Sequence, residues 1–313
     1  MARKLRLEYE GALYHVINRG NYRRDVFELP ATAKAFETAL DEACVLHGWK
    51  LHAYVVMRNH YHLALETPQP NLVAGMHWLQ STFATRFNRF RSEHGHLFQG
   101  RYQSLLVEDW TSLARVVNYI HLNPVRAGIV AAPQVAGFRW SSLARFLKSS
   151  RSGWLVGRDW LAQLGLKDDK AGWSSYVKIL GELARDPVAQ KAEGFDDLCC
   201  GWSIGTAAWR RAIAHDHSHL ALSQGVAALE LKELKEARWT VALNTVLRAA
   251  RKTPKDLNKD AKGAAWKISG AVKLRLAGAP HAWIAEALAM GSSNSVRSYV
   301  SRHSAASNQH LSG

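Results

Sequence analysis

The first 123 residues alternate between strand-like and helix-like patterns, and this order limits the possible fold more than any other feature. Strand patterns, rich in β-branched and aromatic residues, occupy residues 12–18, 49–57, 60–66 and part of 97–107. Helical periods of apolar residues occupy 31–47, 71–91 and 110–123. Pro124 is expected to end the last of these helices. The order β-α-β-β-α-β-α predicts an α+β fold: a ferredoxin-like split βαβ arrangement with an antiparallel sheet.

The character of the sequence changes near residue 148. A loop-like stretch there is followed by residues that read as mostly helical to about 260, with no further strand series, and 226–251 is the clearest helix. We therefore expect a first domain over 1–147, a helical connector over 148–225 and an all-α region over 226–313.

Two short helices at the C-terminal end are joined by a turn at Gly291, within about 281–303. This pattern predicts a helix-turn-helix whose second helix reads DNA, and the alternative is an ordinary helical hairpin. Four polar or basic residues can face outward from that helix: Ser295, Arg297, Ser298 and Arg302.

Charge indicates the kind of partner. The chain of 313 residues holds 41 Lys and Arg against 26 Asp and Glu, for a net charge of +15 and a pI near 9.9. Such an excess favours nucleic acid through phosphate contacts, although a merely basic protein remains the alternative. The candidate phosphate contacts in the first domain are Arg19, Arg23, Arg24, Arg86 and Arg89, which can equally form solvated charged faces.

Several function classes are disfavoured. Three cysteines without a CxxC spacing argue against a disulfide scaffold or a structural zinc site and fit the cytoplasm, where nucleoid DNA is the available partner. The sequence contains no apolar run of ~18 residues, so we expect no membrane span. The sequence contains no GxxxxGK[ST] motif, so we expect no nucleotide cofactor. The His-rich stretch 215–219 has no further ligand at metal spacing, so we do not favour it as a metal site.

Two histidines in the third strand pattern suggest chemistry. Residues two apart in a strand point to one face, so His60 and His62 lie side by side next to the small Ala64. We expect the opposite face to pack on the core and the histidine face to stay open. Paired imidazoles can bind a divalent metal. The alternative is a pair of hydrogen-bonded surface histidines.

The helix at 110–123 places Tyr119 and Asn123 one turn apart, beside its apolar stripe. A helix that flanks the sheet can aim both at the histidine face, where Asn123 offers a metal ligand and Tyr119 a hydroxyl for a phosphate. The alternatives are half-buried packing for Tyr119 and a helix-terminal role for Asn123. We interpret His15 as a satisfied core histidine, and the alternative is that it approaches the candidate site. We expect His121 to point away from Tyr119 in a structural or exposed position.

Four ordered motifs carry a family resemblance: YHVINRG at 14–20, MRNHYH at 57–62, QGRY at 99–102 and YIHLNPVRAG at 119–128. With them, the chain resembles the HUH single-tyrosine transposases over about residues 5–147, and among these most closely the REP-associated tyrosine transposases. Arg58 stands where the family pattern usually has proline, at a turn position.

The resemblance implies an HUH nuclease fold in which His60, His62 and Asn123 bind Mg²⁺ or Mn²⁺. It implies that Tyr119 attacks single-stranded DNA beside hairpin-forming palindromes, leaving a 5′-phosphotyrosine and a free 3′-OH without ATP. Two alternatives remain open: a DNA-binding regulator that does not cut, and a relaxase or rolling-circle initiator. Monomer and homodimer both remain open.

Overall fold

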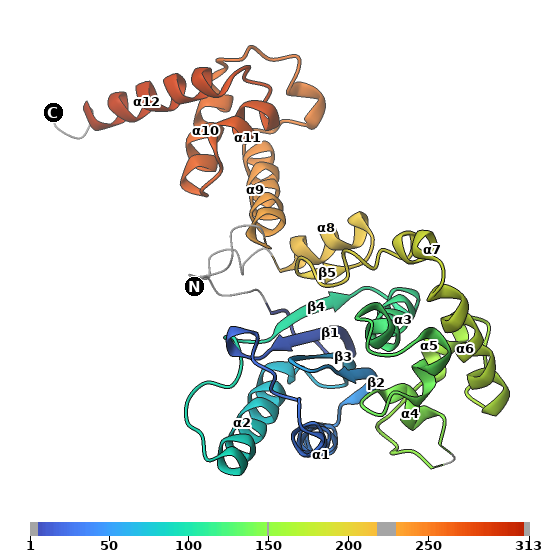
Figure 1. Cartoon of the computed structure of the whole chain (residues 1–313). Helices are drawn as coiled ribbons and strands as arrows, with labels where there is room; N and C mark the ends of the chain where they lie inside the picture. Colours follow the sequence, from blue (N-terminus) through green and yellow to red (C-terminus); the bar gives the residue numbers. More distant parts are fainter. Residues whose placement is uncertain (1–5, 149, 218–229, 310–313) are drawn as a thin grey trace. The chain divides into compact units, whose positions relative to one another are not determined.

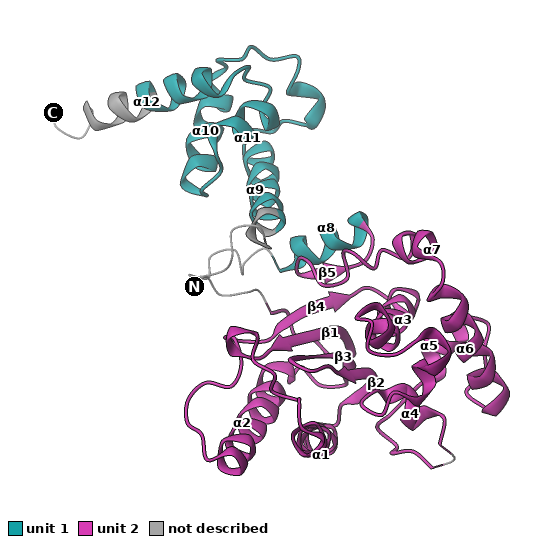
Figure 2. Ribbon diagram, viewed as in Figure 1, with its two compact units in different colours: residues 1–3, 207–313 teal, residues 4–206 magenta. Residues whose placement is uncertain are grey.

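The computed structural model describes residues 6–148, 150–217 and 230–309. Its described residues divide into two compact units (Figure 2), one within 4–206 and the other within 207–313. The sequence places a boundary near residue 148 instead. The two boundaries differ because residues after 148 pack on the first domain, where Leu155 pairs with Leu51 and Ser203–Ile204 pairs with Leu106–Val107.

The centre of the larger unit is a five-stranded sheet in the order β2-β3-β1-β4-β5 (Figure 1). Its strands are β1 (Ala12–Arg19), β2 (Lys50–Val56), β3 (His60–Thr67), β4 (Gln103–Val107) and β5 (Ser203–Ile204). The first four pair antiparallel, whereas β5 runs parallel to β4. After residue 148 the described residues contain this one strand of two residues and no further strand series, in agreement with the sequence.

Two helices cover one face of the sheet: α1 (Pro30–His47) and α2 (Leu72–Arg91) (Figure 1). Phe36 of α1 and Phe83 of α2 meet Tyr61 of β3 in an aromatic cluster that also includes Phe27. All four side chains are buried. This is the apolar strand face that the alternation predicts, and it forms a dry core.

The other face is covered by α3 (Trp110–Arg126), which begins where the Asp109 carboxylate caps the Ser112 amide at 2.7 Å. The expected stop at Pro124 is wrong, since the helix continues to Arg126. Leu122, Asn123 and Pro124 are buried, and this packing outweighs the local preference for extended backbone before proline. The element order β-α-β-β-α-β-α is confirmed.

Beyond α3, short helices pack around its outer side. They are α4 (Ser142–Phe146), α5 (Arg158–Gln163), α6 (Lys170–Leu183) and α7 (Pro187–Ala192), with 3₁₀ turns η1 (Asn21–Arg23) and η2 (Ala132–Gly137) elsewhere in this unit. Trp160, Trp173 and Tyr176 from α5 and α6 pack against one another. These helices keep α3 fixed on the sheet.

The regular secondary structure in the described residues of the smaller unit is all helical. It comprises α8 (Ala207–Asp216), α9 (Glu230–Ala249), η4 (Pro254–Asp256), α10 (Ala265–Leu276), α11 (His281–Ala287) and α12 (Ser293–Gln309). Its own core includes Trp239, Leu274, Ile284 and Val296. The expected helix over 226–251 matches α9, although residues 226–229 lie outside the described part. Among the described residues, no helix combines the length and apolar character needed to cross a membrane.

Candidate active site

The histidine pair lies on β3, on the sheet face that α3 covers. The ring centroids of His60 and His62 are 5.1 Å apart, with their planes at 81°. His60 is half-buried at the start of the strand, and His62 is only 3% exposed. The expectation that this face stays open is therefore wrong. A helix with a strong apolar stripe needs a surface to bury it, and this face of the sheet provides one.

Helix α3 brings Tyr119 and Asn123 onto that pair. The Asn123 amide nitrogen lies 3.5 Å from His62 Nε2, and the Tyr119 ring centroid lies 5.5 Å from that of His62. Tyr119 is 9% exposed and Asn123 is 8% exposed. All four residues singled out by spacing thus meet at one place, contributed by one strand and one helix.

His15 of β1 is a buried, hydrogen-bonded histidine as interpreted, and it also lies at this place beside His62. Its Cα is paired with that of Ala64 on β3, so the small alanine leaves room for the ring next to His62. The His15 and His62 rings are stacked with centroids 5.2 Å apart, and His15 Nε2 lies 3.1 Å from His62 Nδ1. His15 is fully buried. By contrast, His121 is structural as expected, since its two ring nitrogens bond the hydroxyls of Tyr176 and Ser142.

A segment after α7 lies over Tyr119. The Tyr119 hydroxyl is 3.1 Å from Cys199 Sγ, and the Phe195 ring meets the Tyr119 ring edge-on at 5.5 Å. The backbone carbonyl of Leu198 bonds His15 Nδ1 at 2.9 Å. Nothing in the local sequence predicts this covering segment (195–199), because its contacts join residues about 80 or more positions apart.

Burial controls the electrostatics of the site. It lowers the pKa of His15 to about 4, and together with the charge of Arg19 it lowers that of His60 to about 4. It also lowers the pKa of His62 well below its usual range. All three rings are therefore neutral near pH 7, and a neutral imidazole is the form that can bind a metal.

The pKa of the Tyr119 phenol is raised, first by burial and then by Cys199. The tyrosine thus holds its proton in this arrangement. Within the described residues, no three His, Cys, Asp or Glu side chains are grouped to hold a metal ion. A cation at the histidine pair would therefore depend on the Asn123 amide as its third protein ligand.

The basic residues of the first domain that the sequence singles out lie in different surroundings. Arg19 lies near enough to shift the pKa of both histidines. Arg24 pairs with Glu93 at 2.5 Å, and Arg86 forms a two-pronged pair with Glu42. Arg86 and the exposed Arg89 lie on α2, which covers the opposite face of the sheet. The exposed Arg23 lies in the η1 turn.

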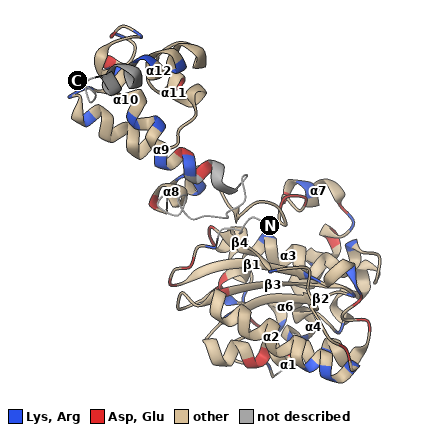
Figure 3. Cartoon of the chain, turned by 90° about the vertical axis from the view of Figure 1, so that its left-hand side faces the viewer, with Lys and Arg blue, Asp and Glu red and all other residues tan. Residues whose placement is uncertain are grey.

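In the smaller unit, α11 and α12 occur where the sequence expects a helix pair, with Gly291 at φ +89° between them. Val296 is buried, whereas Arg297, Ser298 and Arg302 are exposed and Ser295 is half-buried. Lys and Arg positions occur in both units (Figure 3). Of the His-rich stretch 215–219, His215, Asp216 and His217 are described, and the rest lies outside the described residues.

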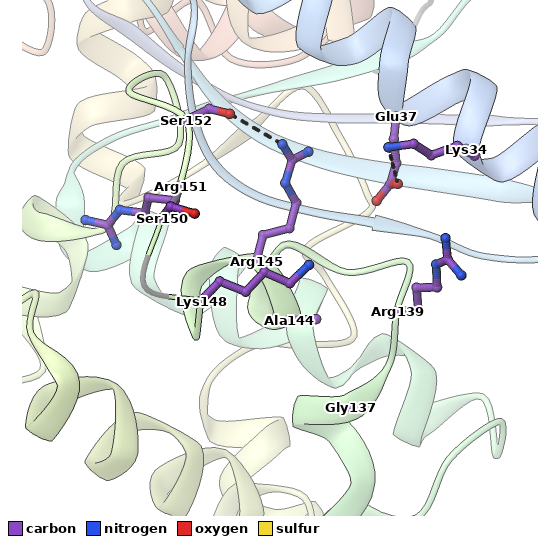
Figure 4. A pocket seen from close by; sticks show the side chains of 10 residues that line it. All are labelled: Lys34, Glu37, Gly137, Arg139, Ala144, Arg145, Lys148, Ser150, Arg151 and Ser152. Carbon is purple, nitrogen blue, oxygen red and sulfur yellow. Dashed lines mark hydrogen bonds and ion pairs between the residues drawn. The ribbon is translucent and has the colours of Figure 1, made fainter.

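Sequence reasoning missed a basic pocket of about 790 Å³ at α4 (Figure 4). Its lining includes Arg139, Arg145, Lys148, Arg151 and Lys34. Arg145 is held by Asp41 and Arg151 by Asp168. No ion pair within the described residues engages Arg139 or Lys148. The signal in the sequence was four cations within residues 139–151.

Comparisons with known proteins show what the first domain is similar to. Residues 8–123 match the model of the family described as "Transposase IS200 like". A curated protein of Haemophilus influenzae, named as a REP-associated tyrosine transposase, is 25% identical over 143 residues, which cover 42% of this chain and 78% of the relative.

Two solved structures are also similar. One is a REP-associated tyrosine transposase bound to a REP hairpin, with 19% identity and a TM-score of 0.41 over 47% of this chain and 86% of that one. The other is described as a transposase from Deinococcus radiodurans, with 26% identity and a TM-score of 0.29 over 38% and 95%. The family match over residues 8–123 and the similarity to the curated relative confirm the resemblance to the REP-associated tyrosine transposases.

Proposed function

We propose that the chain is a metal-dependent endonuclease and strand transferase for single-stranded DNA, of the HUH single-tyrosine class. It acts beside hairpin-forming palindromes through a 5′-phosphotyrosine. The observation that carries this proposal is the convergence of His60, His62, Asn123 and Tyr119 on one face of the sheet. The family match over 8–123 includes all four residues.

The connectivity supports the same proposal. Strands β1 to β4 lie in the order β2-β3-β1-β4, with α1 between β1 and β2 and α2 between β3 and β4. We interpret this as the ferredoxin-like arrangement of an HUH nuclease fold. It places the paired histidines on a central strand, where neighbours on both sides hold their backbone.

The donor set fits a divalent cation. His60 and His62 would supply imidazole nitrogens and Asn123 an amide oxygen, leaving other positions for water and substrate. Imidazole ligands suit Mn²⁺ better than Mg²⁺, which prefers oxygen. When bound, the ion would orient a DNA phosphate and stabilise negative charge on its oxygens.

Tyr119 is the proposed nucleophile. Its phenol oxygen forms a bond to phosphorus while the bond from phosphorus to the 3′ oxygen breaks. The phenol gives up its proton, and the 3′ oxygen takes one up as it leaves. The phosphotyrosine retains the energy of the broken phosphodiester, so a second 3′-OH can reverse the step and join new strands. Cys199 and Phe195 must withdraw for a strand to reach the hydroxyl.

DNA backbone contacts are proposed at two places in the larger unit. Arg19 lies beside the histidines, and the basic pocket offers Arg139 and Lys148 to further phosphates. In the smaller unit, the helix-turn-helix interpretation of α11 and α12 leaves Arg297 and Arg302 of α12 as DNA contacts.

The test is covalent capture. Protein is incubated with Mn²⁺ and a single strand that carries a hairpin, and adducts are separated under denaturing conditions. We expect an adduct in the wild type that is absent in Tyr119→Phe and absent with chelator. Adduct formation by Tyr119→Phe would refute the assigned nucleophile.

A non-cleaving regulator is the second candidate, favoured by one observation: the Tyr119 hydroxyl is buried against Cys199. Such a protein would bind the hairpin equally well after His60→Ala and form no adduct under any metal condition. A relaxase-type enzyme would form the adduct without needing a hairpin, so a hairpin-free strand separates that third possibility.

A further inference from the structure

Two side chains outside the proposed metal ligands contact the Nδ1 atoms of the histidine pair. His60 Nδ1 lies 2.8 Å from Asn59 Oδ1, and His62 Nδ1 lies 3.1 Å from His15 Nε2. A neutral imidazole has one N–H donor and one lone pair, so each Nδ1 contact decides what the opposite nitrogen offers. These contacts therefore show which nitrogen of each ring carries the hydrogen.

For His62, the chain of hydrogen bonds begins at a backbone carbonyl. The Leu198 carbonyl can only accept, so His15 Nδ1 must donate to it across 2.9 Å. His15 is fully buried and no carboxylate contacts its ring, so the ring is neutral and its Nε2 is a lone pair. His62 Nδ1 must then carry the hydrogen. The lone pair of His62 lies on Nε2, which faces Asn123.

For His60, the donor and acceptor ends of an amide fix the direction. The Asn59 Nδ2 group donates to the Arg23 carbonyl at 3.2 Å, which leaves Asn59 Oδ1 facing His60. An amide oxygen only accepts, so His60 Nδ1 carries the hydrogen and Nε2 carries the lone pair. Both histidines thus reach the same tautomer by independent routes.

We propose that His15 and Asn59 are positioning residues: they fix the tautomers of His62 and His60 so that both Nε2 lone pairs are available to one cation. The role in metal binding rests on the proposed function, whereas the tautomers do not. The route through Leu198 also joins the covering segment to a metal ligand, so movement of 195–199 away from Tyr119 would remove the acceptor that orients His15.

The direct test is nitrogen NMR of the metal-free protein with ¹⁵N-labelled histidine. The two ring nitrogens of a neutral histidine differ in chemical shift according to which one bears the hydrogen. The His62 signals are identified by their loss in His62→Gln. We expect the Nδ1–H form for His62 in the wild type and in His15→Gln, whose amide oxygen can accept in place of Nε2. In His15→Phe the acceptor is gone, and we expect the Nε2–H form to appear.

Mn²⁺ affinity, measured by calorimetry, gives a second readout. Loss of a residue that orients a ligand weakens metal binding by roughly 10–100-fold. We expect such a loss in His15→Phe and a smaller one in His15→Gln. Circular dichroism of both variants controls for folding.

The outcomes are distinguishable. An Nε2–H form of His62 in the wild type overturns the proposal, as does equal Mn²⁺ affinity in the wild type and His15→Phe. If the wild type binds no Mn²⁺ but shows the Nδ1–H form, the tautomer assignment is supported and the metal-dependent function is refuted.

Discussion

The two faces of the central sheet are built from the same strands but bury different chemistry. Under α1 and α2, Tyr61 packs with Phe36 and Phe83, and the Tyr61 hydroxyl accepts from Gln80. Under α3, His15 and His62 stack beside Tyr119, with polar atoms bonded to one another. The first face is held mainly by apolar packing, whereas the second holds polar groups that are oriented by hydrogen bonds. Stability is therefore expected to depend most on the first face and catalysis on the second.

The largest effect on stability is expected on the face of the sheet under α1 and α2. Phe36→Ala removes a fully buried ring that meets Phe27, Tyr61 and Phe83. The free energy of unfolding should fall by about 3–5 kcal/mol. Denaturant unfolding measures this loss, with Phe36→Leu as the more conservative control, which keeps a large apolar side chain and is expected to lose less stability than Phe36→Ala. A loss in Phe36→Ala no larger than in Phe36→Leu would mean that this face is not the main apolar core.

On the histidine face, His62→Gln should act on chemistry more than on folding. The variant keeps a polar side chain but loses a proposed ligand, so adduct formation with Mn²⁺ should fall by roughly 100-fold or more. Its free energy of unfolding should fall by less than that of Phe36→Ala. Adduct yield and denaturant unfolding are measured on the same preparation. Unchanged adduct yield would remove His62 from the site.

Helix α3, which covers the histidine face, should also make stability depend on pH through His121. Burial lowers the pKa of His121 from 6.5 to about 3, so between these values the unfolded chain binds more protons than the native one. The free energy of unfolding therefore falls as the pH drops below 6.5, and from pH 7 to pH 5 this one group accounts for roughly 2 kcal/mol. Denaturant unfolding of the metal-free protein at pH 7 and at pH 5 measures this fall in the free energy of unfolding.

His121→Gln is the matched variant for this pH dependence, since an amide can still bond the hydroxyls of Tyr176 and Ser142 without titrating. We expect a smaller drop in stability between pH 7 and pH 5 than in the wild type. An equal drop would show that His121 is not responsible.

The smallest effect is expected at the basic pocket, away from both faces. The double variant Arg139→Ala with Lys148→Ala removes two cations that have no ion pair within the described part of the chain. The logarithmic salt dependence of hairpin binding should become shallower by about 2. The matched control replaces the exposed Arg158 and Lys178 instead. Equal changes in both double variants would indicate a diffuse charge effect and no phosphate contact in the pocket.

The elements of the first domain were predictable because their signals are local. Alternation along β3 and the apolar stripe of α3 each need only neighbouring residues, and together they placed His62 and Tyr119 on surfaces that face each other. The motif order added the family. The course of α3 beyond Pro124 was not predictable, because tertiary packing decided it against the local preference.

The remainder of the site depends on long-range contacts. The place of His15 beside His62 follows from the register of β1 against β3, which periodicity does not fix. The cover over Tyr119 comes from Cys199, a residue whose sequence context suggested only a reduced thiol. A pattern can show which face a residue occupies, but the partner across from it comes from the fold.

The central claim is that Tyr119, although buried, is the residue that joins DNA. Its sharpest rival is Tyr22, which is 93% exposed beside Arg23. Proteolytic mapping of the trapped adduct by mass spectrometry tests the claim directly. We predict the nucleotide on the peptide that contains Tyr119, only when Mn²⁺ is present. A nucleotide on Tyr22, or attachment that persists with chelator, would contradict the account.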